Sequence, residues 1–250
     1  MSGSSDAPEW YRDWFGEEYL ALYPHRDAEE ARAAVELLLK ALGRPRGWIL
    51  DLACGAGRHM DELAERGLAV VGLDLSRTLL REARSRSQHH LLVQGDMRHL
   101  PFRDGSFDVV ANFFTSFGYF AGPEEDSAVL AEIRRVLRPG GGFMLDFLNA
   151  QRVRGSLVPR DERSVNDRRV VQERRLEEDG SVVVKQISVF DPETDKPPRT
   201  YFERVRLYGP VELETMLRAA GLESQTTFGD YSGAGACADC PRYILAGRAV

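Results

Sequence analysis

Hydrophobic and polar positions follow two different periods along this chain, and each change of period marks a predicted element. Apolar residues that recur every three or four positions predict amphipathic helices over residues 27–42, 58–66 and 124–137, and a further helix capped by Ser76. Short apolar runs between these segments are typical of buried strands, and they lie at residues 48–52, 69–74, 91–94, 107–113 and 143–147. This alternation predicts an α/β fold with a doubly wound, Rossmann-like parallel sheet.

The pattern changes after residue 149. Residues 169–207 read as a meander of about three antiparallel strands, with Asp179-Gly180 as a hairpin turn. Pro210 then opens a helix, and two strands near residues 222–231 and 242–249 close the sheet as an antiparallel pair. We therefore divide the chain into an N-terminal helical cap or lid, a ligand-binding core, an antiparallel β insertion, and the closing helix and strands, at residues 1–44, 45–150, 151–208 and 209–250.

Aromatic residues crowd the N-terminal segment. Tyr11, Phe15, Tyr19 and Tyr23 recur at helical spacing, which would place four rings on one face of a helix. Such a stripe is most often core packing. The alternative is a lid whose rings face a bound cation.

Composition narrows the class of protein. The 250 residues, 43% of them hydrophobic, suit one domain built around a single sheet, although two small domains are also compatible. Apolar runs stay well below the roughly 20 residues of a membrane span, and residues 1–8 do not resemble a secretion signal, so we expect a cytoplasmic protein without a membrane partner.

Charge and cysteine content argue against two further kinds of site. The net charge is −6, and the arginines of residues 152–175 are interleaved with acidic residues, which favours an ion-paired surface over a nucleic-acid surface. Three cysteines suggest reduced thiols in this compartment. Cys237 and Cys240 form a lone Cys-x-x-Cys without a second ligand pair, so we expect no metal.

The chemistry begins at residues 49–57, where an apolar strand runs into Asp51-Leu-Ala-Cys-Gly-Ala-Gly57. Glycines at this turn let the backbone approach a ligand closely. A dinucleotide fingerprint would place its third glycine where Met60 stands, which disfavours a nicotinamide cofactor. Asp74 ends the second strand, where a carboxylate can accept hydrogen bonds from a ribose diol. Its alternative role is to help cap the next helix.

Three later segments carry a family resemblance. They are Gly95-Asp96-Met97 after the third strand, Asn112-Phe113 at the end of the fourth, and Leu137-Arg-Pro-Gly-Gly141 before the fifth. With the glycine loop, they make residues 45–150 strongly similar to the class I S-adenosylmethionine-dependent methyltransferases, and residues 209–250 loosely so. The resemblance implies transfer of a methyl group from the sulfonium of S-adenosylmethionine by in-line displacement, leaving S-adenosylhomocysteine.

The resemblance also implies the cofactor contacts. The Asp96 carboxylate would accept from the adenine amine, Met97 would pack on the ring, and the backbone at Asn112 would meet the methionine moiety. The full set of implied cofactor-binding residues is Asp51, Ala53, Gly55, Gly57, Asp74, Leu75, Asp96, Met97 and Asn112.

The acceptor side is less defined. Phe113, Phe117 and Tyr119 follow the fourth strand and are the predicted substrate pocket. Candidate catalytic residues that could orient or deprotonate an acceptor are Asp146, Asn149 and His25.

Residues 112–115, Asn-Phe-Phe-Thr, depart from the Asn-Pro-Pro-aromatic motif of enzymes that methylate adenine in nucleic acid. We therefore expect a small-molecule acceptor, with the β insertion covering the pocket or pairing subunits in a homodimer. An RNA methyltransferase and a nicotinamide-dependent dehydrogenase remain the alternatives.

Overall fold

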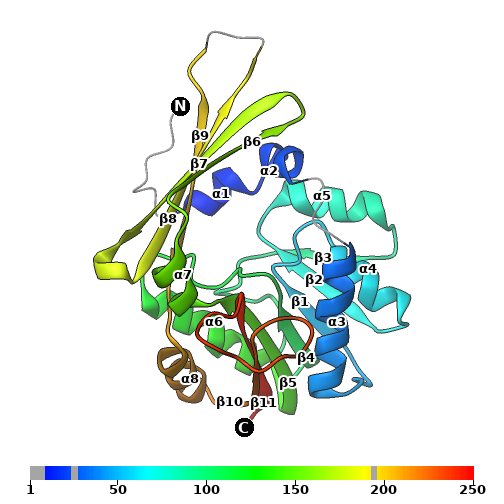
Figure 1. Cartoon of the computed structure of the whole chain (residues 1–250). Coiled ribbons are helices and arrows are strands. Elements are labelled where there is room, and N and C mark those ends of the chain that lie inside the picture. Colours follow the sequence, from blue (N-terminus) through cyan, green and yellow to red (C-terminus); the bar gives the residue numbers. More distant parts are fainter. Residues whose placement is uncertain (1–8, 24–27, 193–195) are drawn as a thin grey trace.

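Strands and helices alternate through most of the chain, as the computed structural model shows for residues 9–23, 28–192 and 196–250 (Figure 1). The helices are α1 (Trp10–Trp14), α2 (Glu17–Leu22), α3 (Ala28–Leu42), α4 (Arg58–Glu65), α5 (Arg77–Arg86), α6 (Pro123–Val136), α7 (Ala150–Ser156) and α8 (Pro210–Ala219), with a short 3-10 turn η1 (Glu178–Gly180). The strands are β1 (Ile49–Leu52), β2 (Val70–Asp74), β3 (Leu91–Gln94), β4 (Phe107–Asn112), β5 (Leu137–Leu148), β6 (Arg160–Val165), β7 (Arg168–Glu177), β8 (Val182–Phe190), β9 (Arg199–Arg206), β10 (Leu222–Phe228) and β11 (Arg242–Ala249).

Seven strands form the central sheet in the order β10-β11-β5-β4-β1-β2-β3. The first five strands in sequence pair in parallel, whereas β11 pairs antiparallel with both β5 and β10. The chain reverses its direction of travel across the sheet between β1 and β4, and ligands of such sheets bind at this switch point. The predicted doubly wound sheet and its closing antiparallel pair are confirmed.

Alternate residues of the buried strands face opposite layers of helices. Leu37 and Leu38 of α3 share one buried cluster with Met144 of β5, whereas Ile133 of α6 and Leu145 share the other. This packing explains why the strands are apolar on both faces.

Strand β5 begins six residues earlier than the hydrophobic run predicted. Phe107 pairs with Leu137 and Val109 with Gly142, so the Arg-Pro-Gly-Gly segment forms an irregularity in the ladder between β4 and β5. Gly140 has a φ of 72° there, which glycine adopts without strain. The prediction failed because glycine and proline usually end a strand and here form a bulge within it.

A second, antiparallel sheet has four strands in the order β6-β7-β8-β9, not the three that were predicted. The missed strand, β6, is mostly polar, and none of its six residues is buried. Arginines of this sheet are paired as expected for an ionic surface: Arg174 of β7 lies 2.5 Å from Asp161 of β6, and Arg160 lies 3.0 Å from Glu162.

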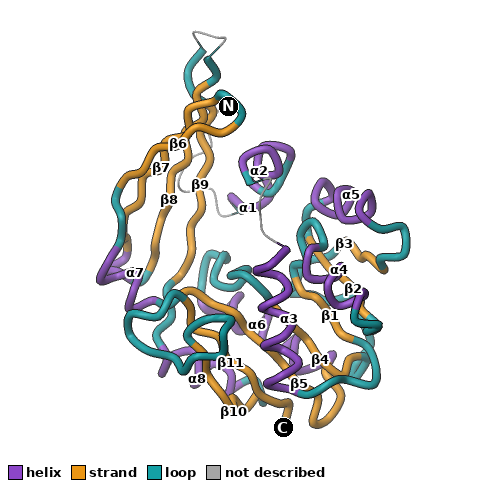
Figure 2. The backbone as a smooth tube through the Cα atoms, turned by 45° about the vertical axis from the view of Figure 1, so that its right-hand side comes forward, coloured by secondary structure: helices purple, strands orange, loops and turns teal. Residues whose placement is uncertain are grey.

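The N-terminal aromatic segment is two short helices rather than one. Gly16 is extended, with φ −128° and ψ −155°, and separates α1 from α2. Both helices lie between the four-stranded sheet and the carboxyl edge of the central sheet (Figures 1 and 2). The Trp14 indole donates to the Glu203 carboxylate of β9 at 2.8 Å, and Ser76 donates to the Phe15 carbonyl at 2.5 Å. We call residues 9–23 the cap.

The cysteines differ from the expectation. Cys237 and Cys240 form a disulfide, which corrects the prediction of reduced thiols for this pair, whereas Cys54 is a free, buried thiol.

Helix α7 was not predicted. Asn149 caps this helix by accepting from the backbone of Gln151 and Arg152. Across the described residues, every helix is too short or too polar to cross a membrane.

Candidate active site

A cavity of about 850 Å³ opens at the carboxyl edge of the central sheet, beneath the cap. Its walls come from the glycine loop after β1, the end of β2, the segment after β3 and the loop after β4. Predicted cofactor residues that line it are Ala53, Gly55, Asp74, Leu75, Asp96 and Met97. The strand ends converge here because parallel strands carry their carboxyl termini at one edge.

The glycine loop owes its shape to left-handed backbone conformations and to one carboxylate. Gly55 and Gly57 have φ values of 56° and 82°, and Gly57 is the N-cap residue of α4. Asp74 accepts from the Gly55 N–H and from the Ser76 N–H, each at 2.8 Å. Asp74 therefore holds the glycine loop and helps to cap α5, and it also lines the cavity as predicted. Burial raises the pKa of Asp74, and its backbone hydrogen bonds oppose that rise.

Asp51 is the least satisfied charge of the site. The residue is 1% exposed, and both carboxylate oxygens lack a hydrogen-bond partner in the described part of the chain. Burial first, and then the neighbouring Asp74, raise the pKa of Asp51 to about 7, while Arg58 opposes the rise. A buried carboxylate in this state is stabilised by a proton or by a cationic group.

Asn112 and Gly57, two of the predicted cofactor residues, do not line the cavity. The Asn112 amide donates to the Leu52 carbonyl at 2.8 Å and so ties β4 to the end of β1. The neighbouring Phe113 does line the cavity and stacks on His59 with 4.3 Å between ring centroids.

Aromatic rings form a further wall of the cavity, which we call the aromatic wall. Tyr11, Phe15, Tyr19 and Tyr23 of the cap all line it, although the helix that was predicted to align them is broken. The facing rings are Phe113, Phe114, Tyr119 and Phe120. Phe15 stacks on Tyr119 with 5.9 Å between centroids, which joins the cap to the loop after β4. The cap therefore acts as a wall of this cavity, and its rings are not simply core.

Phe117, the third predicted pocket residue, is core instead. It is fully buried, and its ring lies 5.9 Å from Phe147 and 5.8 Å from Tyr208. The loop after β4 turns sharply at Phe114 and Thr115, so the alternation of a strand does not continue and the side chain points into the protein.

Asp146 belongs to the framework and is not placed to act as a base. It is fully buried, pairs with Arg242, and accepts from the Tyr231 hydroxyl and from the Phe114 N–H. Arg242 in turn donates to Thr115 Oγ1 at 2.8 Å. Phe114 and Thr115 have φ values of 57° and 56°, which are costly for these residue types, so this buried network holds a strained loop.

Asn149 is also structural. Its amide donates to the carbonyls of Cys237, Ala238 and Cys240 at 2.8–3.1 Å, and its oxygen caps α7. It does not line the cavity. His25, the third candidate base, lies outside the described residues.

Several residues that shape the site were not predicted from the sequence. Arg98 donates to the Asp96 carboxylate, and its place two positions after Asp96 was the available signal. Arg242 and Tyr231 fix Asp146 from distant parts of the chain, and no local pattern marks that contact.

Known proteins share this architecture. A crystal structure described as an S-adenosylmethionine-dependent methyltransferase from Clostridium acetobutylicum superposes with a TM-score of 0.78 at 20% identity, covering 93% of this chain and 96% of that one. Residues 49–141 match a family described as "Methyltransferase domain". The dTDP-3-amino-3,4,6-trideoxy-alpha-D-glucopyranose N,N-dimethyltransferase of Streptomyces venezuelae is 32% identical over 195 residues, covering 75% of this chain and 80% of that protein. The chain belongs to the class I S-adenosylmethionine-dependent methyltransferases.

A second relative aligns over the same number of residues. The cypemycin N-terminal methyltransferase of a Streptomyces species is 33% identical over 195 residues, covering 74% of this chain and 76% of that protein. As a member of this family, the methyltransferase uses S-adenosylmethionine as its methyl donor. Family membership also removes the nicotinamide-dependent alternative.

The site of the methyltransferase fits this donor. S-adenosylmethionine carries two positive charges, on its sulfonium and on its ammonium group, and supplies the methyl group when bound. The glycine loop and aromatic faces that attract cations line the cavity, and the unsatisfied carboxylate of Asp51 precedes that loop in the sequence without reaching the cavity wall.

Proposed function

We propose that the methyltransferase holds its donor along the ends of β1, β2 and β3, and methylates an amine nitrogen of a small molecule at the aromatic wall. On the donor side, Asp74 accepts from the ribose diol, Asp96 and Met97 hold the adenine, and the glycine loop follows the methionine moiety. Asp51 supplies negative charge behind that loop. These roles are supported by the burial, exposure and hydrogen bonding described above.

The aromatic wall is the observation that carries the acceptor assignment. Eight rings from the cap and from the loop after β4 line one cavity with the donor residues. Their faces favour an apolar body and a cationic nitrogen, and methylation of an amine yields a product that becomes such a cation. A neutral amine is already nucleophilic, so the protein needs mainly to orient it and exclude water.

The relatives support the same class. The two described above are named for N,N-dimethylation of an amino sugar nucleotide and for N-terminal methylation of cypemycin. The arginine-rich insertion, in contrast, offers little for RNA. Arg168 lies 2.5 Å from Glu18 of the cap, and Arg169 lies 3.6 Å from Glu162.

Turnover of paired acceptors tests the proposal. Formation of S-adenosylhomocysteine is measured with a dTDP-3-amino sugar, with its 3-hydroxy counterpart, with short peptides bearing a free N-terminus, and with total RNA. We expect turnover with at least one amine and none with the hydroxyl counterpart. Turnover with RNA or with the hydroxyl compound alone would refute an amine acceptor.

Substitution of one ring localises the acceptor. Phe15→Leu removes a cap ring that stacks on Tyr119 but leaves the cofactor residues in place. We expect the KM for the amine to rise by about tenfold, the scale of one lost aromatic contact, with unchanged affinity for S-adenosylhomocysteine. An equal loss of both affinities would place Phe15 at the donor end instead.

A further inference from the structure

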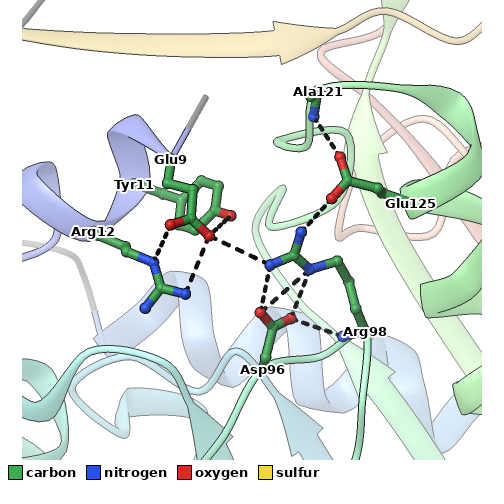
Figure 3. Close-up of polar contacts among 7 residues, drawn as sticks. All are labelled: Glu9, Tyr11, Arg12, Asp96, Arg98, Ala121 and Glu125. Carbon is green, nitrogen blue, oxygen red and sulfur yellow. Dashed lines mark hydrogen bonds and ion pairs between the residues drawn. The ribbon is translucent and has the colours of Figure 1, made fainter. Parts of the chain in front are cut away.

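Arg98 lies where three separate segments of the protein meet (Figure 3). Its own backbone N–H donates to Asp96 Oδ1 at 2.9 Å, its Nε to the same oxygen at 3.1 Å, and its Nη2 to Oδ2 at 2.7 Å. The Asp96 carboxylate, which lines the cavity, is thus held at both oxygens by a single residue.

The remaining face of the guanidinium contacts the segments that carry the aromatic wall. Arg98 pairs with Glu125 of α6, whose other oxygen accepts from the Ala121 N–H at 3.0 Å. Its Nη2 lies 3.5 Å from Glu9, which Arg12 of the cap also binds. The guanidinium carbon lies 4.5 Å from the centre of the Phe120 ring.

Burial ranks these contacts. The Asp96 and Arg98 side chains are 20% and 17% exposed, whereas Glu9 and Glu125 are 44% and 36% exposed. Ion pairs that face water contribute little, so the inner pair dominates and the outer carboxylates add weaker attachments. Burial opposes ionisation of Asp96, but its hydrogen bonds and the charge of Arg98 keep the pKa of Asp96 below its usual value.

The hydrogen bonds from Arg98 restrict what Asp96 can bind on its cavity side. An ionised carboxylate has about four acceptor directions, and the three donors of Arg98 occupy most of them. The direction that remains suits one N–H donor and repels an oxygen acceptor.

We propose that Arg98 is a positioning residue that sets the adenine selectivity of Asp96 and fastens the cap to the adenine site. This inference rests on the proposed placement of the donor. The exocyclic amine of adenine donates to the fixed carboxylate, whereas hypoxanthine presents an oxygen at that position. Because Glu9 joins the same guanidinium to the cap, occupancy of the adenine site steadies α1 and α2.

Calorimetry with two nucleoside ligands tests the selectivity. S-adenosylhomocysteine is compared with its hypoxanthine analogue, S-inosylhomocysteine, on the full chain. The wild type should prefer the adenine compound by about tenfold or more, the factor expected for one charge-assisted hydrogen bond. Arg98→Ala should bring the two affinities within about threefold. Arg98→Lys keeps the charge but loses the planar fork, and should fail to restore the preference.

Arg81 supplies the control, because it is an exposed arginine on α5 whose removal changes the net charge equally. Arg81→Ala should retain the full preference. Retention of the preference in Arg98→Ala would overturn the inference while leaving the donor assignment intact. Failure of the wild type to bind S-adenosylhomocysteine would instead refute the donor site, and this inference with it.

Hydrogen exchange tests the link to the cap. Bound S-adenosylhomocysteine should slow amide exchange in residues 10–22 of the wild type. Glu9→Gln removes the charge that reaches Arg98 without touching Asp96, so it should weaken this protection by about threefold or less, the scale of an exposed ion pair, and keep the adenine preference. Equal protection of the cap in Glu9→Gln, Arg98→Ala and the wild type would refute the link.

Discussion

The unsatisfied carboxylate of Asp51 makes a quantitative prediction about stability and pH. Its pKa is raised from an ordinary value near 3.8 to about 7 in the ligand-free fold, first by burial and then by Asp74. The unfolded chain therefore releases this proton at lower pH than the folded chain does. The stability that the bound proton provides is fully present below the unfolded pKa and is lost as pH rises through the folded pKa.

The magnitude follows from the two pKa values. A difference of about three pH units corresponds to about 4 kcal/mol of destabilisation once the pH is well above 7. Near pH 5.5 the folded carboxyl is still protonated whereas the unfolded one is ionised, and the destabilisation of the fold is about 2 kcal/mol. Asp51→Asn removes the ionisation, so the free-energy difference between variant and wild type should move by about 2 kcal/mol in favour of the variant between pH 5.5 and pH 8.5. Solvent screens this charge little, because Asp51 is 1% exposed.

Urea unfolding of the ligand-free protein at these two pH values measures the effect. Asp179→Asn is the matched control, since Asp179 is exposed in the hairpin turn between β7 and β8 and should show no such dependence. Asp51→Asn should also bind S-adenosylmethionine more weakly, because it removes the negative charge opposite a cationic ligand. A stability difference that does not change with pH would refute the reasoning.

Three further substitutions test the framework of the site. Arg242→Met leaves Asp146 buried without its cation and should lower the free energy of unfolding by about 3 kcal/mol, measured by urea titration, with partial recovery in Arg242→Met/Asp146→Asn. Gly72→Ala places a Cβ against Met60 and 2.7 Å from Cys54 Sγ; it should cost about 1–3 kcal/mol, whereas Gly155→Ala, in open space on α7, should be neutral or stabilising. Ser76→Ala removes the cap bond to Leu79 and the bond to the Phe15 carbonyl, so it should cost about 1 kcal/mol and increase proteolysis between α1 and α2; unchanged proteolysis would contradict the second role.

The donor side of the site could be predicted because it is encoded locally. Asp51, Gly55, Asp74 and Asp96 each lie at or just beyond the end of a short apolar strand, and the order of strands then brings those ends together. Most of the predicted donor residues line one cavity for this reason. Asp51, Gly57 and Asn112 do not line the cavity. Their sequence positions could not exclude them, because a position near a strand end does not say which residues face a ligand.

Other predictions failed where distant contacts override a local pattern. Asp146 lies at the expected edge of the sheet, but Arg242 and Tyr231 from the last part of the chain donate hydrogen bonds to its carboxylate. The cap rings keep their places on the cavity although Gly16 breaks their helix, because Ser76 and Glu203 anchor the cap from other elements. A polar strand such as β6 carries little hydrophobic signal, since it gains its place by pairing with β7.

The contacts that hold the aromatic wall are separate from those that hold the glycine loop. The cap is fixed to the four-stranded sheet through Trp14 and Glu203, and Lys185 of β8 donates to both Glu203 and the Tyr23 hydroxyl at 2.9 and 3.3 Å. Tyr23 lines the cavity, so a change in the insertion would move a ring of the aromatic wall without disturbing the glycine loop or Asp74. Under the proposed function, one donor site can therefore be combined with different acceptor pockets. The strand-end motifs identify S-adenosylmethionine because they are local, whereas the aromatic wall is assembled by contacts between distant segments.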